Sequence, residues 1–246
     1  AMPPFLDSTH FRDDPIELRA RMQRDGYLLI RGLLPGADLE ALRLDFLAIV
    51  RDHGWVDRDT PLADAIADQN GFCVEPKPEN MDVYKHMYAV PQFHALQHHP
   101  SLLDAVAKVL DGAVFPHPRL IGRTIFPKRE SFTTPPHQDF IPIQGTADTI
   151  TAWFPLHDLT AELGGLEVAA GSHQKGVYEF KPALGAGGLA ITDPLAATWT
   201  GGPVAQGDVL LFHSMTAHRG VANTGNALRL SVDARYQRAS DPIAPG

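Results

Sequence analysis

The sequence predicts a mainly β fold with flanking helices, in which a helical N-terminal portion packs against a β-sandwich or barrel. Three observations favour this class. Helical apolar patterns with capping residues occur before about residue 112. Short alternating segments, separated by Gly, Pro and Asp, run from about residue 113 to about residue 240. The 21 glycines and 21 prolines are many for a helical protein and indicate a chain with many turns.

Residues 14–25 are predicted to form the first helix. Asp14 is a good N-cap, Pro15 suits the first helical position, and Gly26 can end the helix. The apolar run at 26–34 follows directly and has the length of a buried strand. The first helix is therefore expected to lead straight into a strand.

Residues 35–54 carry the clearest helical pattern of the chain, with five apolar side chains on one face and Gly54 at the end. Residues 55–85 have weak periodicity and many polar side chains, which predicts a long loop with one short helix. The segment 99–112 is predicted to be a further helix, since Pro100 stands at its start and a glycine at its end.

After about residue 113 the pattern changes to short alternating segments. Strands are predicted at 119–126, 148–159, 164–173, 207–218 and 227–237. The glycine- and alanine-rich segment 174–206 is a long loop, and long loops in compact domains are commonly either functional lids or disordered. No linker or internal repeat divides the chain. Residues 1–246 are therefore expected to form a single domain, with a helical portion to about 112 and a β core from about 113 to 240.

The composition argues against several classes of partner. The net charge is −8 and no run of lysines or arginines occurs, so nucleic-acid binding is not expected. No apolar stretch approaches the roughly 18 residues of a membrane helix, and the N-terminal residues lack the pattern of a signal peptide. The single cysteine, Cys73, fits a reducing compartment. A cytoplasmic protein that acts on a small molecule is therefore expected, and its oligomeric state is left open.

The stretch TTPPHQDFIP at 133–142 holds the first candidate metal ligands, His137 and Asp139. A strand projects alternate residues to one side, so both side chains are expected to face one point while Gln138 points away. Two imidazoles and one carboxylate make up the iron(II) site of many non-haem oxygenases. Because a His-x-Asp pair is common by chance, it predicts a metal site only together with a third ligand.

His218 is the candidate for the third ligand, at the end of the predicted strand 207–218. His213 is the alternative, and five residues away on one strand it would face the opposite side. A hairpin after His218 would return the next strand alongside, with Arg229 at its start. A fixed guanidinium there can bind the far carboxylate of a dicarboxylate cosubstrate, and Ser231 on the same face can add a hydroxyl.

Longer motifs surround these candidate ligands. They are HQD at 137–139, GGLEVAAGSH at 164–173, GDVLLFHSMTAHRGVANTGNALRLSVDARYQ at 207–237 and the N-terminal DGYLLIRGLLPGADLEAL. Together they resemble the phytanoyl-CoA dioxygenase family of Fe(II)/2-oxoglutarate-dependent oxygenases, over nearly the whole chain. The motif at 207–237 is the most specific, because it joins Gly-Asp, a histidine, an asparagine and Arg-x-Ser in order.

The resemblance implies a double-stranded β-helix core (a cupin-like jelly roll) with helices on one side, and a reaction that uses Fe(II), 2-oxoglutarate and O2. The iron ligands that it implies are His137, Asp139 and His218. Arg229 would bind the C5 carboxylate of 2-oxoglutarate. Trp153 matches a tryptophan that lies near the cosubstrate in the family, and Arg123 lies on a strand that lines the family's pocket.

The chain departs from the family pattern at two places. It has Ala-Gly-Ser-His at 170–173 where the family has Pro-Gly-Ser-His, and Leu-Gly-Gly at 163–165 where the family has Asn-Gly-Gly. Neither change is expected to touch the metal or Arg229. Related halogenases lack the metal-binding carboxylate, so the presence of Asp139 favours hydroxylation over halogenation.

These residues favour a 2-oxoglutarate-dependent dioxygenase that hydroxylates an unactivated C–H bond of a small metabolite or natural-product intermediate, with release of succinate and CO2. Desaturation, epoxidation and cyclisation by the same iron chemistry are alternatives. So are a non-catalytic jelly-roll binding or sensor protein and a zinc hydrolase, although the hydrolase gives Arg229 no role. The substrate pocket is expected between the segments 55–90 and 174–206. Its expected lining residues are Gln69, Asn70, Phe72, Tyr84, His86, Met87, Tyr178, Phe180 and Trp199.

Overall fold

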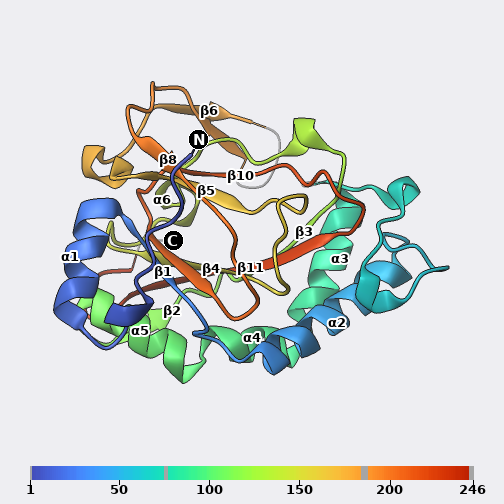
Figure 1. The fold of residues 1–246 in the computed structure, drawn as a ribbon, viewed down its shortest axis with the longest axis horizontal. Coiled ribbons are helices and arrows are strands. Elements are labelled where there is room, and N and C mark those ends of the chain that lie inside the picture. Colours follow the sequence, from blue (N-terminus) through green and yellow to red (C-terminus); the bar gives the residue numbers. More distant parts are fainter. Residues whose placement is uncertain (1, 75–76, 184–187, 244–246) are drawn as a thin grey trace.

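The computed structural model describes residues 2–74, 77–183 and 188–243. Helices cover one side of a large antiparallel sheet, and a smaller sheet lies on its other side (Figure 1). Two apolar clusters follow these layers. The larger cluster joins the helices to the large sheet, and the smaller cluster contains residues from both sheets. The protein is therefore mainly β with flanking helices, as predicted.

Three of the helices begin and end close to the bounds that the sequence predicts, which are 14–25, 35–54 and 99–112. They are α1 (Pro15–Asp25), α2 (Gly36–Asp52), α3 (Pro78–Tyr88), α4 (Pro91–Gln97), α5 (Pro100–Leu110) and the short α6 (Phe140–Ile143). The Asp14 carboxylate accepts hydrogen bonds from the main-chain N–H groups of Ile16 and Glu17, each at 3.1 Å, and so caps α1. Gly26 ends α1 in the left-handed conformation, with φ of 76°. The predicted first helix is confirmed.

The loop expected over 55–85 contains the short helix that the sequence predicted, α3, whereas the next helix, α4, was not predicted. Residues 75 and 76 lie outside the described residues. Both α3 and α4 begin with a proline at the first helical position. Only Val83 and Met87 of α3 are buried, so its apolar pattern covers a single turn. Such a short pattern produces almost no periodicity in the sequence.

The large sheet has the strand order β1-β9-β4-β11-β2, with β3 also paired to β11. Its strands are β1 (Tyr27–Ile30), β2 (Val114–Pro116), β3 (Ile121–Ile125), β4 (Ile150–Pro155), β9 (Val209–His213) and β11 (Arg229–Arg238). Because β1 pairs with β9, the N-terminal portion and the β core share this sheet. The central strand β11 contacts three others.

The central strand β11 is buried on both faces, and the two faces differ in polarity. One face packs into the larger apolar cluster through Leu230, Val232, Ala234 and Tyr236. The alternate positions carry polar side chains, which are also buried: Arg229, Ser231, Asp233 and Arg235. Since successive side chains of a strand point to opposite faces, these four lie on the side away from the helices. A row of buried polar groups of this kind needs partners between the sheets.

The smaller sheet has the order β10-β5-β8, and β6 pairs with β7 in a separate two-stranded sheet. These strands are β5 (Leu166–Ala170), β6 (Phe180–Pro182), β7 (Leu189–Ile191), β8 (Thr198–Thr200) and β10 (His218–Gly220). The segment 174–206 is thus partly strand, with residues 184–187 outside the described residues. In the part of the chain that the structure describes, the sheets do not close into a barrel.

The predicted single strand at 207–218 and the hairpin after it are wrong. The chain leaves β9 after His213 and turns before it enters β10 in the other sheet. The hydroxyl of Ser214 donates to the carbonyl of Ala147, and that of Thr216 donates to the carbonyl of Gly26. These bonds fix the turn, and as a result β10 and β11 lie in different sheets. No helix within 2–74, 77–183 and 188–243 is both long and apolar enough to cross a membrane.

Candidate metal centre

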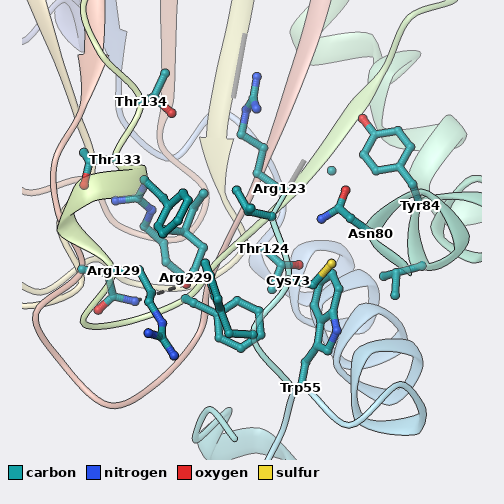
Figure 2. Close-up of a pocket in the computed structure, with 18 of the residues that line it drawn as sticks. Trp55, Cys73, Asn80, Tyr84, Arg123, Thr124, Arg129, Thr133, Thr134 and Arg229 are labelled. Carbon is teal, nitrogen blue, oxygen red and sulfur yellow. Dashed lines mark hydrogen bonds between the residues drawn. The ribbon is translucent and has the colours of Figure 1, made fainter. Parts of the chain in front are cut away.

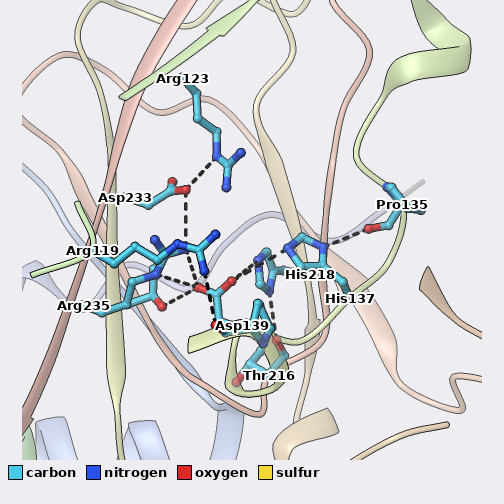
Figure 3. A network of polar contacts seen from close by, with 11 residues as sticks. Arg119, Arg123, Pro135, His137, Asp139, Thr216, His218, Asp233 and Arg235 are labelled. Carbon is cyan, nitrogen blue, oxygen red and sulfur yellow. Dashed lines mark hydrogen bonds and ion pairs between the residues drawn. The ribbon is translucent and has the colours of Figure 1, made fainter. Parts of the chain in front are cut away.

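His137, Asp139 and His218 come together between the two sheets (Figure 3). The Oδ1 atom of Asp139 lies 3.8 Å from His137 Nε2 and 3.7 Å from His218 Nε2. One ligand atom from each residue lies within 4.8 Å of the other two, and the side chains are at most 5% exposed. Three donor atoms at this spacing can bind one metal ion on one side and leave its other side open.

Main-chain hydrogen bonds place the two histidines side by side. The N–H of each donates to the carbonyl oxygen of the other, both at 3.0 Å, and the imidazole centroids lie 4.2 Å apart. The strand expected through His137 and Asp139 is wrong, because Asp139 has helical torsion angles and directly precedes α6. Both side chains nevertheless reach one point. The side chain of Gln138 is turned elsewhere and donates to the carbonyls of Gly176 and Met215.

The hydrogen bonds of the two imidazoles engage their Nδ1 atoms and leave their Nε2 atoms available to a metal ion. His137 Nδ1 lies 2.9 Å from the carbonyl oxygen of Pro135, and His218 Nδ1 lies 3.0 Å from that of Thr216. A carbonyl can only accept, so both Nδ1 atoms carry the proton and both Nε2 atoms present a lone pair. Burial lowers the pKa of His137 to about 3 and also lowers the pKa of His218. Two neutral imidazoles and a carboxylate fit an iron(II) ion.

The carboxylate of Asp139 is held by two residues of the large sheet. Its Oδ2 atom accepts from Thr151 Oγ1 at 2.6 Å and from Arg235 Nη2 and Nε at 3.0 and 3.2 Å. Thr151 on β4 and Arg235 on β11 are direct cross-strand partners, which is why both reach one oxygen. Burial by itself would raise the pKa of Asp139, but Arg235 and the two imidazoles lower it below its usual value. Oδ1 thus remains available to a metal ion.

Arg229 lies on the same face of β11 and is 5% exposed. Its Nη1 donates to the carbonyls of Leu163, Gly165 and Val221 at 3.2, 3.4 and 2.8 Å. Its Nε is buried without a hydrogen-bond partner, and no carboxylate of a described residue pairs with it. Burial lowers its pKa to about 10, and a buried guanidinium of this kind needs an anion. The carboxylate of a 2-oxo dicarboxylic acid would supply one.

The expectation that the segment 163–165 does not touch Arg229 is wrong. The contact runs through main-chain carbonyls, so it does not depend on whether position 163 holds leucine or asparagine.

The other predicted cosubstrate residues line the same cavity as the three candidate ligands. This triad cavity of about 400 Å³ is bordered by His137, Asp139, His218, Arg229, Ser231, Trp153 and Arg123, among others. Ser231 and Trp153 are almost fully buried, at 1% and 2% exposed. Arg123 Nε donates to Asp233 Oδ2 at 2.6 Å. The structure therefore gathers every predicted site residue around one space, although their roles there remain predictions.

A second, larger cavity adjoins the first (Figure 2). This aromatic cavity of about 810 Å³ has walls that include Trp55, Phe72, Val83, Met87, Phe126 and Phe132. It shares four lining residues with the triad cavity: Arg123, Ile125, Thr134 and Arg229. Its wall combines aromatic and aliphatic side chains with many polar ones, among them three arginines. Clefts in which apolar walls and polar groups converge are the usual sites for small organic molecules.

Of the two segments that were expected to supply the pocket residues, 55–90 supplies three and 174–206 supplies none of those predicted. Phe72, Tyr84 and Met87 line the aromatic cavity, whereas Gln69, Asn70 and His86 do not. Tyr178, Phe180 and Trp199 line neither cavity. Tyr178 donates to the carbonyl of Ser172, and Trp199 stacks under the guanidinium of Arg219. The expected lid function of 174–206 therefore has no support from these side chains.

His213, the alternative third ligand, stands apart from the triad. It ends β9, its Nε2 lies 3.6 Å from Asp148, and its ring packs near that of His173.

Sequence reasoning missed Thr151, Asp233 and Arg235, which hold Asp139 and Arg123 in place. A signal was present. Polar residues recur at every second position of Arg-Leu-Ser-Val-Asp-Ala-Arg-Tyr, and all but the serine are charged, in a strand apolar enough to be central. Charges that alternate along a central strand are costly to bury, which marks them as members of a site.

Comparison with known proteins supports these observations. The sequence profile of the family "Phytanoyl-CoA dioxygenase (PhyH)" matches residues 22–231. The 1-deoxypentalenic acid 11-beta-hydroxylase of Streptomyces exfoliatus is 30% identical over 96% of this chain and 86% of its own. A phytanoyl-CoA dioxygenase domain-containing protein 1 from Danio rerio is 25% identical, over 85% of each chain.

A solved structure shares the fold. The epimerase SnoN, in complex with Fe³⁺, alpha ketoglutarate and nogalamycin RO, superposes with a TM-score of 0.67 at 22% identity, over 95% of this chain and 87% of its own. The predicted cupin-like jelly-roll class is thereby confirmed.

Proposed function

The chain belongs to the phytanoyl-CoA dioxygenase family, and from this premise we propose that it hydroxylates a C–H bond of a small, largely apolar organic molecule. It is a 2-oxoglutarate-dependent dioxygenase with iron as its metal. The reaction outcome and the substrate are the proposed part. They are supported by the Streptomyces relative, which is named as a hydroxylase of 1-deoxypentalenic acid.

We assign a role to each residue of the triad cavity. The Nε2 atoms of His137 and His218 and Oδ1 of Asp139 would hold the iron. Arg229 would bind the far carboxylate of 2-oxoglutarate, with Ser231 and Trp153 beside it. Iron(II) and 2-oxoglutarate together supply the activation of O2 that C–H oxidation requires. The chain's contribution is to position these groups and keep bulk water away.

The observation that carries the proposal is the shared wall of the two cavities. Arg123, Ile125, Thr134 and Arg229 border both, so a molecule in the aromatic cavity lies directly beside the triad cavity. The aromatic and aliphatic side chains of the wall suit an apolar body, and the polar side chains among them can bind a few polar groups. Such a molecule would present a C–H bond to the metal side.

The test is succinate formation by the purified protein with iron(II), 2-oxoglutarate and a panel of apolar natural-product intermediates. Turnover should disappear with an iron chelator and in His218→Ala. His213→Ala is the matched control, because it removes a nearby histidine that lies outside the triad, and it should retain turnover. Full activity of His218→Ala would overturn the ligand assignment. A product heavier by one oxygen atom supports hydroxylation, whereas loss of two hydrogen atoms would indicate desaturation instead.

A further inference from the structure

The aromatic cavity contains several buried polar atoms that lack a hydrogen-bond partner. Asn80 Oδ1, Thr124 Oγ1, Arg129 Nε and Arg229 Nε have none among the described residues, and all four residues line this cavity. Buried polar groups are nearly always satisfied, so unsatisfied groups gathered around one space indicate that a bound molecule or ordered water completes them. Arg229 is accounted for by the cosubstrate, which leaves the other three.

Arg129 has the chemistry to bind an anion. Its guanidinium lies over the ring of Phe72, 4.3 Å from the centroid, and its Nη2 donates to the carbonyl of Gln69 at 3.3 Å. No carboxylate of a described residue forms an ion pair with it. The stack and the single main-chain bond hold the group in one orientation, which lowers the entropic cost of binding a ligand. Arginine binds carboxylates with paired hydrogen bonds more effectively than lysine does.

The other two arginines of the cavity already have partners among the described residues. Arg123 is paired with Asp233, and Arg229 is held by three carbonyls at the triad cavity. Arg129 lies on one side of the aromatic cavity, while Asn80 and Tyr84 lie on the other (Figure 2). The apolar side chains of Phe126 and Trp55 complete the wall. Of the three arginines that line this space, Arg129 is therefore the one whose guanidinium has neither a carboxylate partner in the described part of the chain nor a proposed role in binding 2-oxoglutarate.

We propose that the aromatic cavity binds an apolar molecule that carries one carboxylate, and that Arg129 binds this carboxylate and so fixes which end of the molecule faces the triad cavity. The inference rests on the proposed function, because it specifies the substrate class of the same site. Arg129 is then a specificity-determining residue. Its stack on Phe72 places the cation against the apolar wall, where an ion pair is less screened by water than at an open surface.

The test compares a matched pair of ligands, adamantane carboxylate and the neutral adamantane methanol, by isothermal titration calorimetry. The protein is loaded with iron(II) and 2-oxoglutarate under anaerobic conditions, so that binding is measured without turnover. The variants are Arg129→Gln, Arg129→Lys and the control Lys128→Gln. Lys128 is the preceding residue, is exposed and lines neither cavity, so its variant removes the same charge without touching the proposed site.

We expect the wild-type protein to bind the carboxylate about tenfold or more tightly than the alcohol. Arg129→Gln should remove this preference while its affinity for the alcohol changes little, Arg129→Lys should keep part of it, and Lys128→Gln should behave as wild type. A uniform loss for both ligands in Arg129→Gln would mean that Arg129 only supports the loop of Phe72, and would overturn the inference. Absence of a preference in the wild type, or equal effects of the two charge-removing variants, would also overturn it.

Succinate formation, measured on the same samples after oxygen is admitted, separates this inference from the function on which it rests. A carboxylate preference that depends on Arg129, without iron-dependent turnover of 2-oxoglutarate under any condition, would contradict the function and leave the binding site standing. Turnover without any such preference would contradict only the role of Arg129.

Discussion

Arg235 and Asp139 form an ion pair that is almost completely removed from water, and Arg235→Gln tests how strongly the fold depends on it. The side chains are 2% and 4% exposed, and the closest contact is 3.0 Å. The substitution removes the guanidinium but leaves the charged carboxylate in place, with Thr151 as its remaining hydrogen-bond donor. Asp233 lies 3.6 Å from Arg235 and loses this positive neighbour at the same time, so that Arg123 remains as its ion-pair partner.

The expected cost in the metal-free protein is about 3–5 kcal/mol of the free energy of unfolding, the range for removing one partner of a buried pair. Arg238→Gln is the matched control on the same strand. Its two partners, Asp148 and Asp241, are 49% and 18% exposed and Arg238 itself is 26% exposed. Since both ion pairs are in contact with water, the loss of Arg238 should cost no more than about 1 kcal/mol. The two substitutions remove the same charge from β11, three residues apart, and differ in how far the ion pair is buried.

Urea unfolding in the presence of a chelator, followed by circular dichroism, measures both variants. The double variant Arg235→Gln/Asp139→Asn completes the experiment, because it also removes the uncompensated carboxylate. It should regain at least about half of the loss caused by Arg235→Gln alone. A cost for Arg235→Gln below about 1 kcal/mol, or no recovery in the double variant, would refute the view that Arg235 neutralises and orients Asp139.

Arg229→Gln is expected to raise the KM for 2-oxoglutarate about 10- to 100-fold, with little effect on CO2 release from 2-oxopentanoate, which lacks the far carboxylate; an equal loss with both would contradict the assignment. Gly164→Ala should be more destabilising than Gly176→Ala in thermal unfolding. Both glycines have positive φ, but only at Gly164 would a Cβ lie 2.7 Å from two carbonyl oxygens and 3.1 Å from Arg229 Nη1. The metal-free protein should lose stability as the pH falls from 6.5 towards 4. Burial lowers the pKa of His137 to about 3 and that of His157 to about 4 in the folded protein. The unfolded chain therefore takes up protons at these two histidines first, which favours unfolding. The loss due to His137 alone should be about 2 kcal/mol near pH 5, and a melting temperature that stays constant over this range would contradict it.

The sequence was sufficient for residues whose identity and order carry the chemistry. His137, Asp139, His218 and Arg229 stand in motifs whose order can be recognised without knowing how the chain folds. Their neighbours could not be found in this way. Thr151 and Arg235 act together because β4 and β11 pair in one particular register, and they are 84 residues apart in the chain. Such a register depends on packing of the whole sheet, not on local sequence.

Local pattern also failed where tertiary bonds override it. The segment 207–218 alternates like one strand, but the turn after His213 is fixed by hydroxyl groups that bond to main-chain carbonyls far away in sequence. His218 could be identified although the predicted hairpin was wrong, because its motif, not the topology, marks it. Arg129 had no signal at all, since a lone arginine before a turn looks like any solvated surface residue.

The proposed iron ligands belong to both layers of the sandwich. His218 is part of the smaller sheet and holds His137 by two main-chain bonds, whereas Asp139 is fastened to the larger sheet through Thr151 and Arg235. An ion bound by all three would therefore cross-link the two sheets. Loss of the metal would then end catalysis and also remove a cross-link between two sheets that, over the described residues, do not close into a barrel.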